Sequence, residues 1–142
     1  MGSFLCGPSG GTGGAGFGDE VPASGVSVAG ILVWHGDYID AIQLQYSDGT
    51  ATAKHGGSGG SLTEFPLGPG EFIAMLSGMY GDYVDSLTIF TNIRTFPPLG
   101  GTGGNKSYIY SAPENWEVAG FIGASGSYVD AIGIVARESF PG

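Results

Sequence analysis

The chain has 142 residues, and four Lys or Arg stand against thirteen Asp or Glu, which gives a formal net charge of −9. So few basic residues cannot neutralise nucleic-acid phosphates or an anionic membrane surface, and neither is expected as a partner. The 29 glycines far exceed the usual share of roughly 7%, but the 12% of aromatic residues argues against disorder. The length suits one domain with its own core.

Neither a membrane span nor a signal peptide is visible. The longest apolar run, residues 28–34, is about a third of the roughly 20 residues that a span needs. The chain does not open on a basic segment followed by a long apolar stretch. We expect a soluble protein without membrane insertion, of undetermined compartment. The single cysteine, Cys6, excludes an internal disulfide.

The first third of the chain contains the features that later recur. A glycine-rich run, Gly-Gly-Thr-Gly-Gly, occupies residues 10–14, and the apolar stretch 28–34 leads into Gly-Asp-Tyr-Ile-Asp at 36–40. Apolar residues then alternate at 42, 44 and 46, and this period of two predicts a β-strand with one face turned inward. The Asp-Gly pair at 48–49 favours a hairpin turn.

The same features return twice at nearly constant spacing. The pattern Gly-x-Tyr-Ile/Val-Asp recurs at 81–85 and 126–130, 45 residues apart each time, and each copy runs into alternating apolar residues. The glycine run recurs at 56–60 and 100–104. Two motifs repeated three times in one register indicate internal repeats of about 45 residues. With a strand and a turn about every 10 residues, each repeat predicts about four short strands.

Three repeats of this kind predict an all-β fold of three four-stranded sheets packed as the walls of a prism. A β-trefoil also has three similar units, but it usually carries Gln-x-Trp in each, and neither Gln43 nor Gln45 is followed by Trp at that spacing. The trefoil is therefore the second alternative. Propellers have four to eight blades and are disfavoured.

On these motifs the chain resembles the jacalin-related lectin family, whose fold is the β-prism I, with three Greek-key-like sheets related by pseudo-three-fold symmetry. The resemblance covers essentially the whole chain and implies one domain over residues 1–142. Three Gly-x-Tyr-x-Asp loops paired with three glycine runs are similar, within that family, to griffithsin-type mannose-binding lectins. The resemblance implies a non-enzymatic lectin that binds mannose- or glucose-type sugars, as in oligomannose glycans and glycoproteins, through three loop sites without a metal or cofactor.

The family's binding residues can be carried over by position. In that family the motif Asp accepts hydrogen bonds from the sugar 4- and 6-hydroxyls, backbone N–H groups of two earlier loop residues hold the 6-oxygen, and the last Gly of a glycine run donates to the 3- or 4-oxygen. This implies a first site at Asp37, Tyr38 and Asp40 with Gly60, a second at Asp82, Tyr83 and Asp85 with Gly104, and a third at Ser127, Tyr128 and Asp130 with Gly14.

These residue types suit a neutral polyol. A carboxylate is acceptor-only and can receive two hydroxyl protons, and charge-assisted hydrogen bonds are stronger than neutral ones. Glycine lets a ligand approach the backbone N–H groups that serve as donors. The motif tyrosines can offer a ring to a sugar face and a hydroxyl at the rim.

Other interpretations remain open. The chain could bind galactose, or it could be a structural or interaction module that has lost sugar binding; a homodimer is compatible with the resemblance. A hydrolase is disfavoured because no acid/base pair recurs across the repeats. Residues 11–16 match Gly-x-Gly-x-x-Gly but open no helix, so dinucleotide binding is rejected. His35 is interpreted as rim variation and His55 as a strand-end residue, without the partners of a zinc site.

Overall fold

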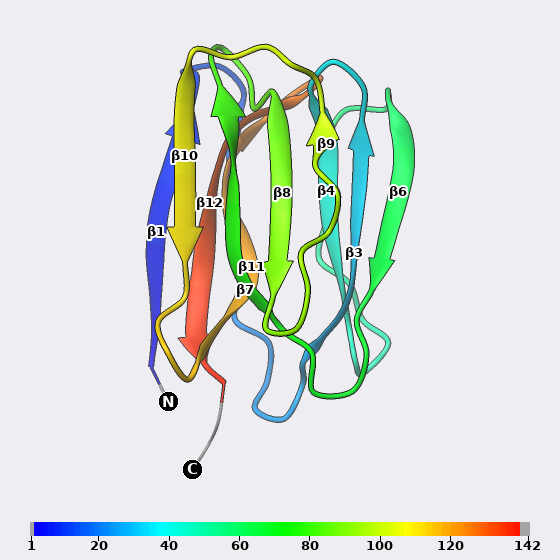
Figure 1. Cartoon of the computed structure of the whole chain (residues 1–142), viewed down its shortest axis with the longest axis vertical. Helices are drawn as coiled ribbons and strands as arrows, with labels where there is room; N and C mark the ends of the chain where they lie inside the picture. The colour runs from blue at the N-terminus through cyan, green and yellow to red at the C-terminus, as the bar shows by residue number, and fades with distance from the viewer. Residues whose placement is uncertain (1, 140–142) are drawn as a thin grey trace.

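The computed structural model describes residues 2–139, so that Met1 and residues 140–142 of the predicted domain lie outside it. Within the described range it contains twelve β-strands and no helix, which confirms the all-β prediction (Figure 1). The strands are β1 Ser3–Gly10, β2 Ala15–Gly18, β3 Val28–His35, β4 Ile39–Tyr46, β5 His55–Gly56, β6 Ser61–Pro66, β7 Ile73–Tyr80, β8 Ser86–Thr91, β9 Leu99–Gly100, β10 Lys106–Ser111, β11 Trp116–Ser125 and β12 Val129–Glu138. No helix in this range is long and apolar enough to cross a membrane.

All three sheets have four strands and the same topology. The orders are β5-β4-β3-β6, β10-β7-β8-β9 and β1-β12-β11-β2. In the first two, an antiparallel hairpin forms the centre, the next strand lies beside the hairpin's second strand, and the fourth returns beside its first, which is a Greek key. In the third sheet β1 and β2 take the same two outer places beside the hairpin β11–β12. The third sheet joins β1 and β2 to β11 and β12, so the two ends of the chain close the prism together (Figure 1).

The alternating apolar residues fill the space between the sheets. Successive side chains of a strand point to opposite faces, so every second residue is turned toward the prism axis. The six predicted inward residues are at most 1% exposed, namely Ile42, Leu44, Leu87, Ile89, Ile132 and Ile134. Their burial removes apolar surface of all three sheets from contact with water, and the hydrophobic effect thereby stabilises the prism.

One end of the prism gathers the six glycine-containing segments. The Gly-x-Tyr-Ile/Val-Asp segments, called motif loops below, connect the central hairpins β3–β4, β7–β8 and β11–β12. The glycine runs connect β1 to β2, β5 to β6 and β9 to β10 at that same end (Figure 1). The Greek-key connection thus brings each motif loop close to a glycine run that lies some twenty residues away in the chain, or, for the third sheet, at its other end.

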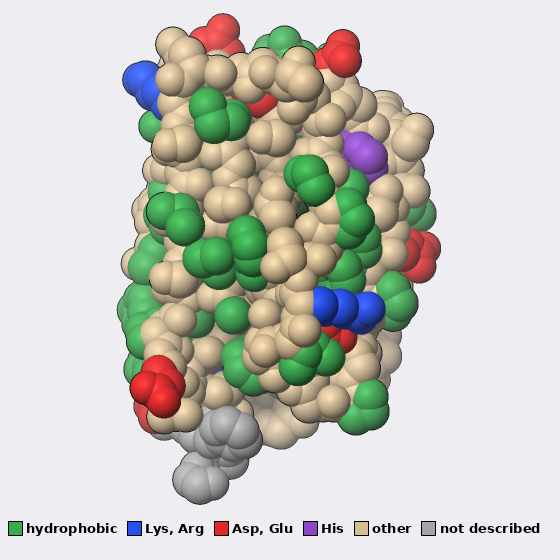
Figure 2. All heavy atoms as spheres, viewed as in Figure 1, with side chains coloured by type: hydrophobic (Ala, Val, Ile, Leu, Met, Phe, Trp, Pro, Cys, Tyr) green, Lys and Arg blue, Asp and Glu red, His purple; other side chains and the backbone are tan. Residues whose placement is uncertain are grey.

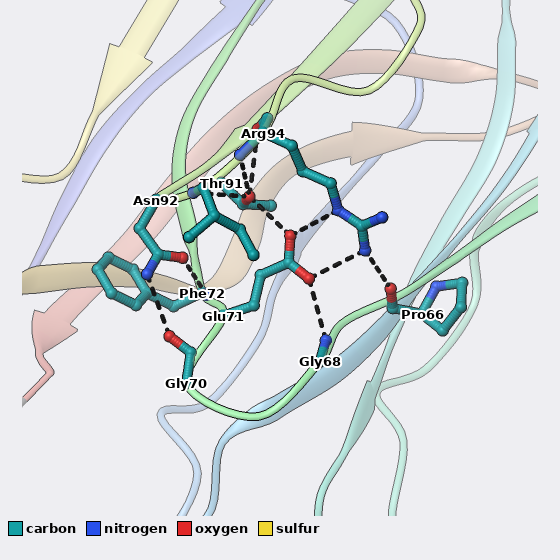
Figure 3. Close-up of polar contacts among 9 residues, drawn as sticks. Pro66, Gly68, Gly70, Glu71, Phe72, Thr91, Asn92 and Arg94 are labelled. Carbon is teal, nitrogen blue, oxygen red and sulfur yellow. Dashed lines mark hydrogen bonds and ion pairs between the residues drawn. The ribbon is translucent and has the colours of Figure 1, made fainter.

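An ion pair between a buried carboxylate and a half-exposed arginine stabilises the opposite end, where the β6–β7 loop meets the segment after β8 (Figure 3). The Glu71 side chain is only 1% exposed, and Arg94 donates to its two oxygens at 2.8 and 2.9 Å. The Gly68 N–H and the Thr91 hydroxyl donate to the same carboxylate at 3.0 and 2.7 Å. The hydrogen bonds from Arg94 are the main cause that lowers the pKa of Glu71 to about 2.

Replacing Glu71 by Gln keeps the shape of the side chain but removes its charge. We expect the free energy of unfolding to fall by about 2 kcal/mol at neutral pH, because the charge-assisted hydrogen bonds are weakened. A lowered pKa in the folded state means that the carboxylate stabilises the fold fully above about pH 4.5 and loses this effect as the pH falls toward about 2. Urea unfolding of the wild type and of Glu71→Gln should therefore show that the difference between their free energies of unfolding becomes smaller as the pH is lowered from about 4.5 to about 2.

The exposed Glu64 on β6 provides the matched control. Glu64→Gln should change the free energy of unfolding by no more than about 0.5 kcal/mol at any pH tested. A difference between the wild type and Glu71→Gln that stays constant down to about pH 2 would contradict the assigned role of the carboxylate.

Candidate functional site

The three motif loops have the same backbone conformation. In each, the N–H of the leading glycine donates to the carbonyl of the motif tyrosine, at 3.0 Å from Gly36, 3.0 Å from Gly81 and 2.9 Å from Gly126. This bond closes a tight loop in which the second residue, Asp37, Asp82 or Ser127, is exposed. The Asp that ends each loop is instead buried, with exposed fractions of 7%, 6% and 5% for Asp40, Asp85 and Asp130.

Each buried Asp lies against one glycine run. Its carbonyl accepts from the second glycine of the run, in the pairs Gly57 to Asp40 at 3.0 Å, Gly101 to Asp85 at 2.9 Å and Gly11 to Asp130 at 2.9 Å. Its carboxylate lies under the last glycine of the same run. A Cβ placed there would come within 2.5–3.0 Å of an Oδ1 atom, for the pairs Gly60 with Asp40, Gly104 with Asp85 and Gly14 with Asp130.

The structure therefore brings together the residues that the sequence had assigned to each site. The third pairing joins Gly14, near the start of the chain, to Asp130, near its end, because β1 and β12 are neighbours in one sheet. These three glycines have φ between +78° and +89°, a conformation that L side chains rarely adopt. Glycine is needed here both for the backbone conformation and for the space above the carboxylate.

Most of the polar groups predicted to meet a ligand have no protein partner among the described residues; the Asp85 carboxylate accepts from the Gly81 backbone N–H. Within residues 2–139, the N–H groups of the last glycine of each run donate to no carbonyl or side-chain oxygen, and no side chain donates to the three carboxylates. At the second loop the groups face a hollow of about 470 Å³, lined by Tyr38, Gly81, Asp82, Tyr83, Asp85, Gly104 and Asn105. Free acceptors thus lie beside free, rigidly held donors, an arrangement that can bind vicinal hydroxyls.

Burial also sets the electrostatics of the three carboxylates. Loss of solvation raises the pKa of Asp40, Asp85 and Asp130 above the ordinary value of an aspartate. At Asp40 the neighbouring His35 opposes this shift and Asp37 adds to it. Acidic side chains and one basic side chain project at the end of the molecule where the motif loops lie, and other charged side chains are scattered over the rest of the face in view (Figure 2).

The motif tyrosines contact one another. The ring centroids of Tyr38, Tyr83 and Tyr128 are 4.8–5.0 Å apart in all three pairs, and the rings are half-buried. The predicted contact of each ring with a sugar face stays a prediction. The mutual packing was not foreseen, because equal spacing along the chain does not reveal that the three loops meet at one axis.

The surroundings of the three loops differ. Asn105 lines the second hollow, whereas the equivalent residue after the other glycine runs is Ser61 or Ala15. The sequence analysis missed Asn105, although comparing the position after each run would have singled it out. His35, predicted as rim variation, lies beside the first loop with its Nε2 2.7 Å from the Thr63 hydroxyl.

His55 is a strand-end residue, as predicted, and has a structural partner. It opens β5, its Nε2 lies 2.6 Å from Oδ1 of Asp19, and its ring stacks on Phe17 with centroids 3.9 Å apart. The other Asp19 oxygen accepts from the Phe121 N–H. Across residues 2–139 no three His, Cys, Asp or Glu side chains are grouped so as to hold a metal ion.

Comparisons with known proteins bear on both fold and site. A family model described as a jacalin-like lectin domain matches residues 6–135. The chain belongs to the jacalin-like lectin family. A mannose/glucose-specific lectin from Parkia pendula is 31% identical over 153 aligned positions, covering 96% of this chain. Malaysian banana lectin superimposes with a TM-score of 0.85 at 30% identity over 96% of this chain and 99% of its own. Artocarpin in complex with mannotriose gives 0.84 at 29% identity over 95% and 97%.

Membership of the jacalin-like family identifies the three-walled fold as the β-prism I and excludes the trefoil. The alignment covers almost the whole of each of these solved lectin chains, so the prism of this chain corresponds to their complete domain. The curated relatives are longer. The chain spans 32% of the Parkia pendula protein and between 24% and 45% of the other curated relatives compared.

The glycine that covers a motif carboxylate should tolerate no side chain. Gly60 and Gly49 have nearly the same φ, +83° and +88°, so alanine at either position costs about 1–2 kcal/mol of backbone strain. A Cβ on Gly60 would also lie 2.7 Å from Asp40 Oδ1 and 2.8 Å from the His35 backbone nitrogen, whereas one on Gly49 would have no atom within 4 Å. Gly60→Ala should therefore lower the free energy of unfolding by about 1–3 kcal/mol more than Gly49→Ala, as measured by urea unfolding. Equal losses would show that Asp40 does not confine this glycine.

Proposed function

We propose that residues 1–142 act as one lectin domain that binds mannose- or glucose-type sugars at three metal-independent sites, one at each motif loop. The observation that carries this proposal is the threefold pairing of a buried carboxylate with an unpartnered glycine N–H. The first site consists of Asp37, Tyr38, Asp40 and Gly60, the second of Asp82, Tyr83, Asp85 and Gly104, and the third of Ser127, Tyr128, Asp130 and Gly14.

Each site offers a hexose both kinds of partner. The carboxylate accepts two adjacent hydroxyl protons, and the N–H groups of the glycine and of the motif loop donate to the sugar oxygens. The donors belong to a backbone held by sheet strands on both sides, so little conformational entropy is lost on binding. The third loop carries Ser127 where the others have Asp, and it still qualifies because only the backbone of this residue is used.

The relatives support the choice of sugar. The Parkia pendula relative is named as mannose/glucose-specific, and the artocarpin structure contains mannotriose. We propose mannose-bearing glycans or glycoproteins as the partners of this chain. The binding of sugar without turnover is also part of the proposal, since the same acceptor and donor set occurs three times and contains no acid/base pair for bond cleavage.

Replacing one motif carboxylate should abolish one site. In Asp40→Asn the amide has one acceptor oxygen and no charge, so we expect methyl α-mannoside to leave the Gly60 amide resonance unshifted while those of Gly104 and Gly14 still saturate. Titration followed by amide nuclear magnetic resonance, with EDTA present, measures all three sites at once. In the same way, Asp85→Asn should abolish the mannoside-induced shift of the Gly104 amide resonance, and Asp130→Asn that of Gly14.

Asp48, in the exposed turn after β4, is the matched control. Asp48→Asn should leave all three titrations as in the wild type. Shifts that require calcium, or that follow methyl α-galactoside more strongly than the mannoside, would contradict the proposed sites or the proposed sugar. A wild-type protein without any saturable shift would favour the interaction-module alternative.

Three sites at one end of a prism should favour branched ligands. A single mannose bound by one small site is expected to have a dissociation constant near 1 mM, which corresponds to a binding free energy of about −4 kcal/mol. A branched oligomannose that reaches two sites gains an effective concentration, so its affinity should be about 10²- to 10⁴-fold higher. Calorimetric titration with both ligands measures the ratio. An oligomannose that exceeds the monosaccharide only by its number of mannose units would show that the sites act singly.

A further inference from the structure

The motif loops contact one another through the three tyrosine rings. Each ring of Tyr38, Tyr83 and Tyr128 meets both others, with centroid separations of 5.0, 4.9 and 4.8 Å and interplanar angles of 57–64°. The Tyr38–Tyr83 pair is edge-to-face and the other two pairs are tilted; edge-to-face contacts at such separations are favourable beyond the apolar area that they bury. Each tyrosine precedes a buried motif Asp by two residues, so the position of its ring is directly coupled to the backbone that carries the carboxylate.

Backbone hydrogen bonds link the same loops beneath the rings. The Ile39 N–H donates to the Val84 carbonyl and the Val84 N–H to the Val129 carbonyl, both at 2.9 Å. These three residues stand between the tyrosine and the Asp of their respective loops, and each is 0% exposed. Hydrogen bonds in a dry interior are costly to break without a replacement partner, so the loops are held at a common register around the axis.

The glycine runs add a third link between neighbouring sites. While the second glycine of each run is hydrogen-bonded to its own Asp, it also touches the next motif loop. A Cβ on Gly57 would lie 2.2 Å from the Ser127 carbonyl oxygen, one on Gly101 2.3 Å from that of Asp37, and one on Gly11 2.1 Å from that of Asp82. Each run is thus packed between two loops, and the three contacts form a closed cycle.

We propose that the three sites form one interlocked unit in which each motif tyrosine is a positioning residue for the neighbouring sites as well as its own. This rests on the proposed sugar-binding function. A site binds well only if its carboxylate and N–H groups are already in place, because ordering them on binding would reduce the affinity. Removing one ring loosens the packing against both neighbouring loops, and it therefore weakens sites whose own residues are intact.

The test compares Tyr83→Ala with Tyr83→Phe. The dissociation constant for methyl α-mannoside is measured separately at the first and third sites, from the Gly60 and Gly14 amide resonances. In Tyr83→Ala both constants should rise about threefold or more, the range expected for mutations that act through coupled contacts. Tyr83→Phe keeps the ring and should restore both constants to within about twofold of the wild type.

Tyr110 on β10 provides a control for the loss of an aromatic ring elsewhere, since it is half-buried and contacts Ser9 and Tyr108 rather than a motif loop. Tyr110→Ala should leave both constants unchanged. Wild-type constants at the first and third sites in Tyr83→Ala would overturn the proposal, as would an equal weakening by Tyr110→Ala. If Tyr83→Ala does not fold, Tyr83→Leu, which keeps apolar bulk without the ring, serves for the same comparison.

A measurement without sugar separates failure of this proposal from failure of the sugar-binding function. Hydrogen exchange of the Ile39 amide, whose N–H is bonded to Val84, should be faster in Tyr83→Ala than in the wild type and in Tyr83→Phe. If the wild type binds no mannoside, the sugar-binding function is wrong, and the exchange rates still decide the interlock. Unchanged exchange at Ile39 would overturn the interlock whatever the sugar titrations show.

Discussion

The contact on which the proposed binding sites depend is a carboxylate buried beneath bare glycine backbone. The charge of an Asp that is almost fully buried loses its solvation and needs hydrogen-bond donors from the protein in its place. Here the protein supplies them incompletely, since burial raises the pKa of the Asp and no side chain in the described range donates to it. The glycine above it leaves room for a ligand in place of a side chain. A neutral polyol can supply the missing donors, which is why the incompletely satisfied burial supports the proposed binding sites.

The prism fold places three such contacts at the same end. Greek-key connections bring each glycine run to the head of its own sheet, and the close packing of three sheets around one core brings the heads together. Contacts between the tyrosine rings, and backbone hydrogen bonds among Ile39, Val84 and Val129, then connect the motif loops of the three repeats. The proposed multivalent binding and the proposed mutual support of the sites therefore share one structural origin, the pseudo-three-fold axis.

The two ends of the molecule use charge differently. At the end opposite the motif loops, Glu71 is also buried, but Arg94, Thr91 and Gly68 satisfy its carboxylate, and its pKa falls to about 2 (Figure 3). No side chain in the described range donates to the motif aspartates, and loss of solvation raises their pKa values. Similar burial thus yields a structural carboxylate where donors are present and a candidate ligand-binding one where they are absent.

Local pattern was enough to predict the strands, the inward face of each sheet and the threefold repeat, because alternation such as Ile42 and Leu44 reports the strand period directly. Resemblance added the pairing of each Asp with a glycine run. The tertiary structure alone decided that the tyrosines meet, that Asn105 lines one hollow and that Arg94 neutralises Glu71. The 45-residue spacing of the tyrosines does not reveal that their loops meet, and the other two contacts do not follow the repeat. All of these contacts exist only once the sheets have closed around the core, and no local pattern encodes that geometry.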